Sequence, residues 1–256
     1  MCGNPSSCVL PSNLLQRGCL ALKGTCETSY AHAMKVLIVS RTVVERKRCI
    51  GALVRTNDGY QSLRLMDARI LPTGTFWAES APFRIGELWE IEQGPAASIR
   101  QPHNEDILVY EYTLVNSSFT DLQRLDEWLR SHFHKIDPPC MWEGTPESLF
   151  GGKLQSTRKY NGRGFVTKAN LPEVSTGFWI PDQPLKKVLY EEKASYLYNN
   201  GLQKVRVGKL KYIGEPEPPD QIPAGTLVRV SLSRWIEFPP YPEACWLMLS
   251  GWYGAL

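Results

Sequence analysis

The stretch Ala224–Leu256, "AGTLVRVSLSRWIEFPPYPEACWLMLSGWYGAL", contains two apolar-rich runs on either side of a proline-rich turn. In the first run apolar side chains alternate with others, which is the period of a β-strand. One face carries Val228, Val230 and Leu232, and the other carries Arg229, Ser231, Ser233 and Trp235. The second face is either solvated or turned toward a ligand, with arginine for charge and tryptophan for stacking. The second run, "CWLMLSGWY", shows no alternation, which indicates a strand buried on both faces.

The rest of the chain after Met34 shows the same β-rich pattern. Before a single helical segment we expect five short strands within about 80 residues, in "KVLIVS", "RCIGALVR", "YQSLRLMD", "GELWEIEQG" and "DILVYEYTLV". Thr56-Asn57-Asp58-Gly59 predicts a tight hairpin between the second and third of these. After the helix the chain returns to short strands and turns, so we expect a second half built like the first.

The helical segment lies between the two halves. Leu122, Leu125, Leu129 and Phe133 recur at helical spacing. A capping box with Thr120 as the N-cap and Gln123 at N3 is expected to begin the helix, and Pro138-Pro139 is expected to end it. The pattern therefore predicts an all-β fold with minor α, made of two related small barrels joined by a linking helix.

Composition limits the classes of function. The 256 residues are 43% hydrophobic, enough for real cores, and no apolar run approaches the roughly 20 residues that cross a bilayer, so we expect no membrane partner. A net charge of +3 permits a nucleic-acid partner without indicating one. Seven cysteines, an odd number without a CxxC pair, fit a reducing cytoplasm better than a disulfide framework or a zinc site.

The first 33 residues are set apart by their composition. They hold four of the cysteines, lack the basic start of a signal peptide and show no amphipathic period. "MKVLIVS" follows directly and has the pattern of a natural start. We therefore expect residues 1–33 to be an extension that contributes little to the fold, with a folded cap or redox element as the alternative.

Several motifs resemble those of one known family. They are "MKVLIVSRTVVERKRCIGAL", "SLRLMD", "IGELWEIE", "NEDILVYEY", "STGFWIPDQPL", "LKYIGEPEPPDQIPAGTLVRVSLSRW" and "CWLMLSGWY". Over residues 34–256 the chain resembles bacterial dual OB-fold (DuOB) domain proteins. The resemblance implies that the all-β fold (minor α) consists of two small OB-like β-barrels, over residues 34–118 and 141–256, joined by a linking helix over residues 119–140. It implies little about function beyond what OB-folds do in general.

OB-folds commonly bind single-stranded nucleic acid with a positive groove and stacking aromatics. The candidate nucleic-acid-binding residues are Arg41, Lys47, Arg48, Arg64, Trp179, Arg206, Lys211, Arg229, Arg234 and Trp235. By strict alternation Arg234 falls on the apolar side of its strand, where a charge must reach the barrel rim, pair with a carboxylate or follow a bulge. Asp182 and the Glu105–Asp106 pair are the candidate partners.

Other classes of function find less support. His132 and His134 point about 200° apart on a helix, so they do not readily share a metal, and we expect no metal or other cofactor. Cys49 and Cys245 lie in apolar strands without an identifiable histidine, so we expect no enzyme. A non-catalytic nucleic-acid-binding protein is the favoured function, and a protein-interaction subunit of a larger bacterial complex is the alternative. Convergence of the basic residues on one groove with exposed aromatic residues favours the first, and dispersal favours the second.

Overall fold

The computed structural model describes residues 32–69, 74–95, 99–119, 121–156, 162–190, 192–198, 207–238 and 241–254. These residues all belong to one compact unit. The predicted extension over residues 1–33 falls almost wholly outside the described residues.

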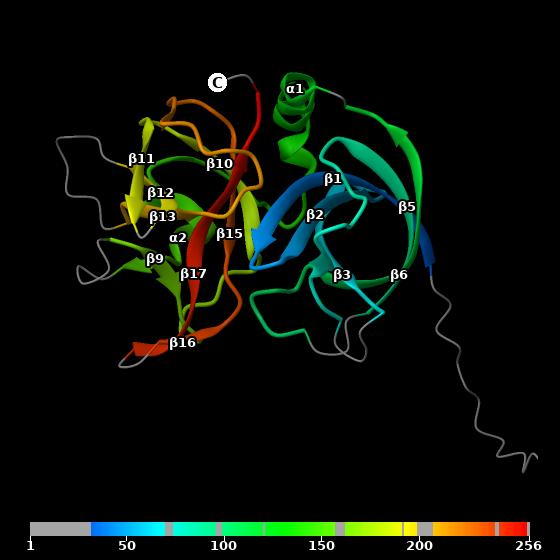
Figure 1. The fold of residues 1–256 in the computed structure, drawn as a ribbon, viewed down its shortest axis with the longest axis horizontal. Coiled ribbons are helices and arrows are strands. Elements are labelled where there is room, and N and C mark those ends of the chain that lie inside the picture. Colours follow the sequence, from blue (N-terminus) through cyan, green and yellow to red (C-terminus); the bar gives the residue numbers. More distant parts are fainter. Residues whose placement is uncertain are drawn as a thin grey trace, which may run out of the picture. The chain divides into compact units, whose positions relative to one another are not determined.

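The first half of the chain forms a closed barrel of five strands (Figure 1). Its strands are β1 (His32–Val44), β2 (Lys47–Arg55), β3 (Tyr60–Asp67), β5 (Glu87–Pro95) and β6 (Asp106–Ser117), with a short β4 (Trp77–Ala78) beside β2. The order β1-β2-β3-β6-β5 returns to β1, and only the β3–β6 pair is parallel. This is the five-stranded Greek-key barrel of the OB-fold.

Strand β1 is apolar on both faces because it belongs to two cores. Val36 and Ile38 point into the first barrel, where Trp77, Phe83 and Trp89 pack edge to face. Leu37 and Val39 belong to a larger cluster that includes the linking helix and the second barrel. The run of apolar residues in "KVLIVS" therefore reflects burial from both sides.

The linking helix α1 (Leu122–His132) packs Leu125 and Leu129 into that larger cluster, and the 3-10 helix η1 (Phe133–Lys135) continues it. Its N-cap is Asp121, whose carboxylate accepts from the Gln123 amide, and not the predicted Thr120, which lies outside the described residues. A carboxylate and a hydroxyl fill the same role at an N-cap, so the predicted helix started one residue early.

The second half begins with short elements and then forms a curled sheet. The elements are β7 (Met141–Gly144), η2 (Pro146–Ser148), α2 (Leu149–Gly152), β8 (Gln155–Ser156), β9 (Gly164–Val166), β10 (Thr176–Pro181), β11 (Leu185–Tyr190), β12 (Lys193–Tyr198), β13 (Lys209–Tyr212), β14 (Gln221–Ile222), β15 (Val228–Leu232), β16 (Ile236–Phe238) and β17 (Tyr241–Trp252). The path β11-β12-β13-β17-β15-β10 has one parallel pair, β13 with β17. If β10 and β11 are taken as one strand that is interrupted at residues 182–184, the strands of this sheet are paired in the same order as those of the first barrel.

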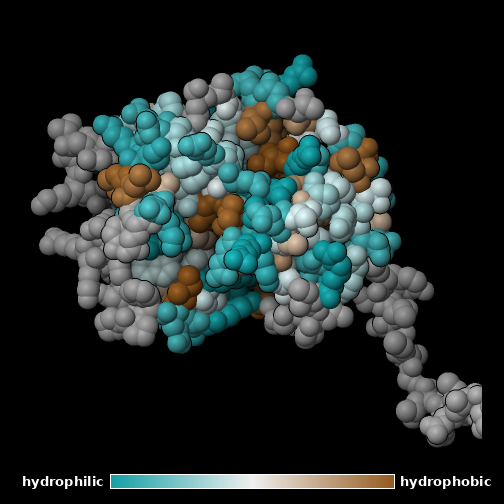
Figure 2. Space-filling view, viewed as in Figure 1, coloured by the Kyte–Doolittle hydropathy of each residue, from teal (hydrophilic) through white to brown (hydrophobic). Residues whose placement is uncertain are grey.

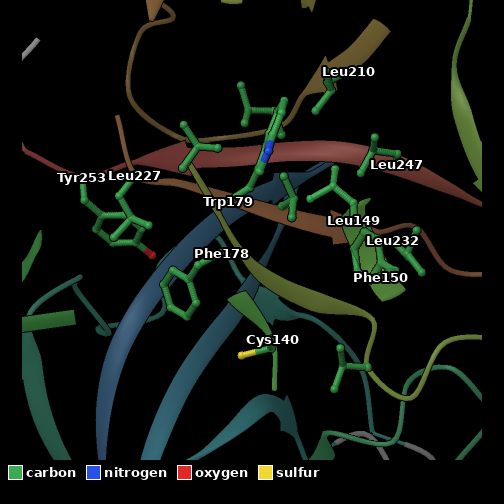
Figure 3. Close-up of a cluster of buried hydrophobic side chains, with 14 of the residues drawn as sticks. Cys140, Leu149, Phe150, Phe178, Trp179, Leu210, Leu227, Leu232, Leu247 and Tyr253 are labelled. Carbon is green, nitrogen blue, oxygen red and sulfur yellow. The ribbon is translucent and has the colours of Figure 1, made fainter. Parts of the chain in front are cut away.

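The second barrel has a large apolar core, shown in Figure 3 around Phe178, Trp179, Leu210 and Leu247. Trp179 is fully buried, and its indole Nε1 donates to the Gly144 carbonyl oxygen at 2.9 Å. Buried tryptophans usually satisfy this donor. The prediction of two OB-like barrels joined by a helix is confirmed by these strand orders.

The barrels contact each other through backbone and side chains. The Val43 amide donates to the Ile213 carbonyl at 2.8 Å, and the Tyr253 hydroxyl donates to the Val39 carbonyl. Arg48 of β2 lies 3.0 Å from Glu215 of the second half. In the described parts of the chain, no helix is long and apolar enough to cross a membrane.

Candidate functional site

A pocket of about 310 Å³ lies between the two barrels. The first barrel contributes residues of β1, β2 and β3, and the second contributes residues of β13, β15 and β17. Four of its lining residues are basic, namely Arg64, Lys211, Arg229 and Arg234, and all four are among the predicted binding residues. Sequence alternation placed Arg229 and Ser231 on one face of their strand, and that face lines this pocket.

Arg229 is the most deeply buried of the four, with 2% of its surface exposed. Its Nη2 donates to the hydroxyls of Thr176 at 2.8 Å and of Ser62, in the other barrel, at 3.2 Å. The guanidinium carbon lies 4.3 Å from the centre of the Phe178 ring. Among the described residues, its Nε and Nη1 have no hydrogen-bond partner and its charge has no carboxylate partner. A buried charge in this state is unfavourable unless an anion compensates it.

Arg64 and Arg234 share one carboxylate. Arg64 Nε lies 2.5 Å from one Asp106 oxygen, and Arg234 Nη1 lies 2.6 Å from the other. Burial acts to lower the pKa of Arg64, but the nearby Asp106 and Glu105 charges outweigh it and the net pKa is raised. Burial, followed by repulsion from Arg64, lowers the pKa of Arg234. Of the predicted partners for Arg234, the Glu105–Asp106 pair supplies the carboxylate, and Asp182 instead accepts from the Tyr198 hydroxyl.

Lys211 connects the pocket with a cationic face on the second barrel, which we define as Arg163, Lys193, Lys209 and Lys211. Lys211 lies opposite Ser195 in the β12–β13 pair, on the face away from the buried Tyr196 and Leu210. Burial first, and then the charges of Arg163 and Lys193, lower the pKa of Lys211. Arg163 is bridged to Lys209, which lies two residues before Lys211 on the same face of β13, so these cations lie close together.

Hydroxyl groups complete the walls of the pocket. The residues that line the pocket with a hydroxyl group are Ser40, Thr42, Thr176, Ser231, Ser233 and Ser250. Ser231 and Ser250 are hydrogen-bonded to each other at 2.7 Å. Hydroxyls both donate and accept, so together with guanidinium groups they suit the oxygens of an anion.

Arg41 and Arg48 lie together at the other contact between the barrels. Glu215 pairs with both, at 3.1 and 3.0 Å, and Arg48 also pairs with Glu79 at 2.7 Å. The pKa of Arg48 is raised because its hydrogen bonds to Glu215 and Glu79 outweigh the lowering effect of burial. With these carboxylates in place, the two arginines hold the barrels together and offer little charge to a ligand.

The other predicted residues lie elsewhere. Lys47 is exposed and donates to the Thr75 hydroxyl at 2.9 Å. Trp235 lies under Arg100 with its Nε1 bonded to the Gln101 carbonyl. The predicted stacking role of Trp179 does not fit its position, because a fully buried ring offers no face to a base. Arg206 lies outside the described residues.

A histidine beside Cys245 was missed by the sequence analysis. Cys245 Sγ lies 3.9 Å from His103 Nε2, although 142 positions separate them in the chain. Burial raises the pKa of the Cys245 thiol to about 12, and burial together with Arg64 and Arg234 lowers the pKa of His103 to about 2. Both shifts oppose a thiolate–imidazolium pair, so this geometry does not make a cysteine nucleophile. No three His, Cys, Asp or Glu side chains of the described residues are grouped closely enough to hold a metal ion.

The sequence analysis also missed the residues that give the pocket its shape. Ser40 and Thr176 come from strands that read as plain apolar runs, and their approach to Arg229 depends on how the barrels meet. Gly51 offered a weak signal, since a glycine inside a strand marks a close approach. A Cβ at Gly51 would lie 2.3 Å from the Ser40 hydroxyl and 3.7 Å from Arg229 Nη2.

Comparisons with known proteins give no family. No protein-family model matches the chain, and no curated protein matches it. Among solved structures, it is similar to the Ifi202 HINa domain in complex with 20-bp dsDNA (TM-score 0.30, 8% identity, covering 88% of this chain and 97% of that one). It is also similar to the p204 HINb domain (TM-score 0.32, 11% identity, 86% and 97%) and to p202 HIN1 in complex with 12-mer dsDNA (TM-score 0.32, 9% identity, 87% and 93%). At such low TM-scores, the fold assignment rests on strand order and register alone.

Proposed function

We propose that the protein is a non-catalytic binding protein for nucleic acid, with single strands preferred. The observation that carries this proposal is the position of Lys211, which lines the pocket and also lies on the face of β13 that carries the other cations. Positive charge therefore continues from β12 and β13 to Arg229 between the barrels. A flexible polyanion fits such a run better than a compact ligand does.

The fold supports the same assignment. Strands β12 and β13 are the second and third strands of their barrel, and OB-folds bind oligonucleotides across the face of these two strands. Lys193 is exposed on this face, and Lys211 is partly exposed beside it. Lysines there neutralise backbone phosphates without reading the bases, so the preference for a sequence is expected to be weak.

The test is fluorescence anisotropy of the full chain with labelled single-stranded DNA, single-stranded RNA and duplex DNA over a range of salt. We expect the single strands to bind more tightly, with affinity falling steeply as salt rises. The double variant Lys193→Gln with Lys211→Gln removes two phosphate contacts. It should reduce the slope of log affinity against log salt by about 1.4, at about 0.7 for each contact on a single strand.

The matched control is Arg55→Gln with Arg124→Gln, which removes two exposed charges outside the pocket and the cationic face. This control should keep the slope of the unmodified protein. Equal slopes for the two double variants would contradict the role of the cationic face. Absence of binding to all three nucleic acids at low salt would overturn the proposed function.

A protein partner is the second candidate, and one surface favours it. Strand β6 pairs with β3 only as far as Val109, and beyond that point it exposes Tyr110, Leu114 and Val115. A strand with an unpaired edge and exposed apolar side chains is a recurrent site for peptide addition. Figure 2 shows that hydrophobic residues form separate small patches on a mostly hydrophilic described surface in that view. If no nucleic acid binds, this part of β6 is the surface to examine.

A further inference from the structure

We propose that the pocket between the barrels binds a phosphomonoester, a phosphate group with two negative charges. Its source is either the terminal phosphate of a nucleic-acid strand or a free mononucleotide. The proposal deepens the proposed function and rests on it for the first of these sources. Internal phosphates of a strand are diesters with one charge, so a pocket for a phosphomonoester would distinguish the phosphorylated end of a strand from the phosphates within it.

The first argument is the balance of charge. Four cations line the pocket, namely Arg64, Arg234, Lys211 and Arg229. The buried carboxylates beside these cations are Asp106, bound to Arg64 and Arg234, and Glu105, whose charge also acts on Arg64. Glu45 lies exposed in the turn between β1 and β2, where solvent and salt screen its charge. Away from this exposed rim, four cations against two carboxylates leave a surplus of two, which a phosphomonoester dianion matches better than a diester does.

The second argument is the state of Arg229. Its guanidinium is buried, lines the pocket and has two nitrogens without a hydrogen-bond partner among the described residues. Arg64 Nη2 is in the same state. Guanidinium groups bind phosphate oxygens through pairs of N–H donors, so unused donors from β3 and β15 are suited to one phosphate group.

The third argument is size. Ligand pockets generally range from about 300 to 1,000 Å³, so a pocket of about 310 Å³ is at the small end. It has room for a phosphate with its sugar or for one nucleotide, and not for several nucleotides of a strand. The apolar part of the lining includes Phe76, against which the Arg234 guanidinium lies at 5.3 Å from the ring centre.

The experiment compares three labelled single-stranded DNAs of one sequence with the full chain. One has a 5′-phosphate, one has a 3′-phosphate, and one has a hydroxyl at both ends. We expect one of the phosphorylated strands to bind about tenfold more tightly than the strand with two hydroxyls. Because the second pKa of a phosphomonoester is about 6, this ratio should fall between pH 7.5 and pH 5 as the dianion becomes a monoanion.

Two variants test whether the pocket is responsible for the ratio of the two affinities. Arg229→Lys keeps the charge but loses the paired donors, so it should lower the ratio well below that of the unmodified protein. Because a change at a buried arginine can impair folding, Ser231→Ala serves as a milder second variant, and it should lower the ratio in part. Arg124→Lys on the exposed face of α1 is the control and should keep the ratio of the unmodified protein.

Calorimetric titration with a nucleoside 5′-monophosphate, the matching nucleoside and inorganic phosphate distinguishes the two sources. Equal binding of all three strands, with no binding of the monophosphate, overturns this proposal and leaves the proposed function in place. No strand binding, with monophosphate binding that Arg229→Lys abolishes, overturns the proposed function and supports the pocket for a free nucleotide. No binding of any probe overturns both.

Discussion

His103 is a buried base whose charge is suppressed. Its side chain lies close to Arg64 and Arg234, and burial with these charges lowers its pKa from 6.5 to about 2. Between these values the unfolded chain binds a proton that the folded chain does not. The free energy of unfolding should therefore fall as the pH drops below 6.5, by at most about 1.4 kcal/mol for each pH unit from this residue.

The measurement is urea unfolding at pH 7.5, 6.5, 5.5 and 4.8 for the protein and for His103→Gln. The variant cannot take up this proton, so its stability should change less over this range, whatever its absolute stability. Carboxylates with lowered pKa values, such as Glu243 held by Arg100 and Lys168, lose their contribution only as the pH falls below about 4.5. If the free energy of unfolding depends on pH equally in the two proteins, the charge of His103 is not suppressed in the folded state.

Single residues were predictable where one strand decides their environment. Strict alternation placed Arg234 on the apolar side of its run, for which pairing with a carboxylate was one of the predicted outcomes, and Asp106 is that carboxylate. Trp179 was not predictable in the same way, because tryptophan is common both in cores and at binding surfaces. Its burial depends on Gly144 and on the neighbouring strand β7, whose parallel pairing with β10 has no local signal in the sequence.

At the scale of an element, β1 and β2 approach each other unusually closely at one pair. Ser40 is paired with Gly51, directly after an irregularity between Ile38 and Ser40. Gly51→Ala would put a methyl group 2.3 Å from the Ser40 hydroxyl oxygen. We expect it to destabilise the protein by about 1–3 kcal/mol, as overpacking does.

A double variant identifies the cause. In Gly51→Ala with Ser40→Ala the hydroxyl is gone, and the nearest remaining Ser40 atom, its Cβ, lies at an ordinary 3.5 Å. Thermal unfolding should show most of the loss recovered, relative to Ser40→Ala alone. A loss that persists in the double variant would mean that the backbone at Gly51, and not the contact with Ser40, sets the cost.

The existence of the strands and of the helix was predicted more fully than the residues at which they begin and end. Alternation and turns identified the strands of the first barrel, because each has one or two apolar faces and clear turn residues. The first strand of the second barrel is interrupted at residues 182–184, so it appears in the sequence as separate short runs. The β12–β13 pairing depends on a connection that includes residues 199–206, outside the described residues.

At the scale of the whole molecule, one side of the first barrel packs into the core of the second, although the first barrel also has a core of its own. Leu37, Val39 and Leu53 of the first barrel belong to the same cluster as the interior of the second. We therefore expect one cooperative unfolding transition and not two. Far-ultraviolet circular dichroism and tryptophan fluorescence, which reports on Trp89 in one barrel and Trp179 in the other, should give coincident denaturation curves.

Leu53→Ala gives this expectation a second readout. The residue is 2% exposed and lies at the contact of the two halves, so the single transition should move as a whole to lower denaturant. Ala52→Gly, on the side of the same strand that faces the first barrel alone, is the comparison. A first transition that separates from a second in either protein would mean that the barrels unfold independently.

The pocket itself was beyond prediction from the sequence, although its basic residues were not. Arg64 and Arg229 were both candidates, but nothing local indicates that β3 and β15 face each other across one cavity. Which surfaces of two barrels meet depends on long-range packing of Leu37, Val39 and the helix α1 between them. The resemblance to dual OB-fold proteins stays a prediction.

The middle of strand β1, residues 36–40, has no face exposed to solvent. Val36 and Ile38 fill one barrel while Leu37 and Val39 fill the core shared with the other, and the next residue, Ser40, borders the pocket. A strand in an ordinary barrel keeps one face on which mutations accumulate without harm. In evolutionary terms this part of β1 has no such reserve, so we expect variation between descendants to be narrowly confined there, as in β15, whose five residues are all buried.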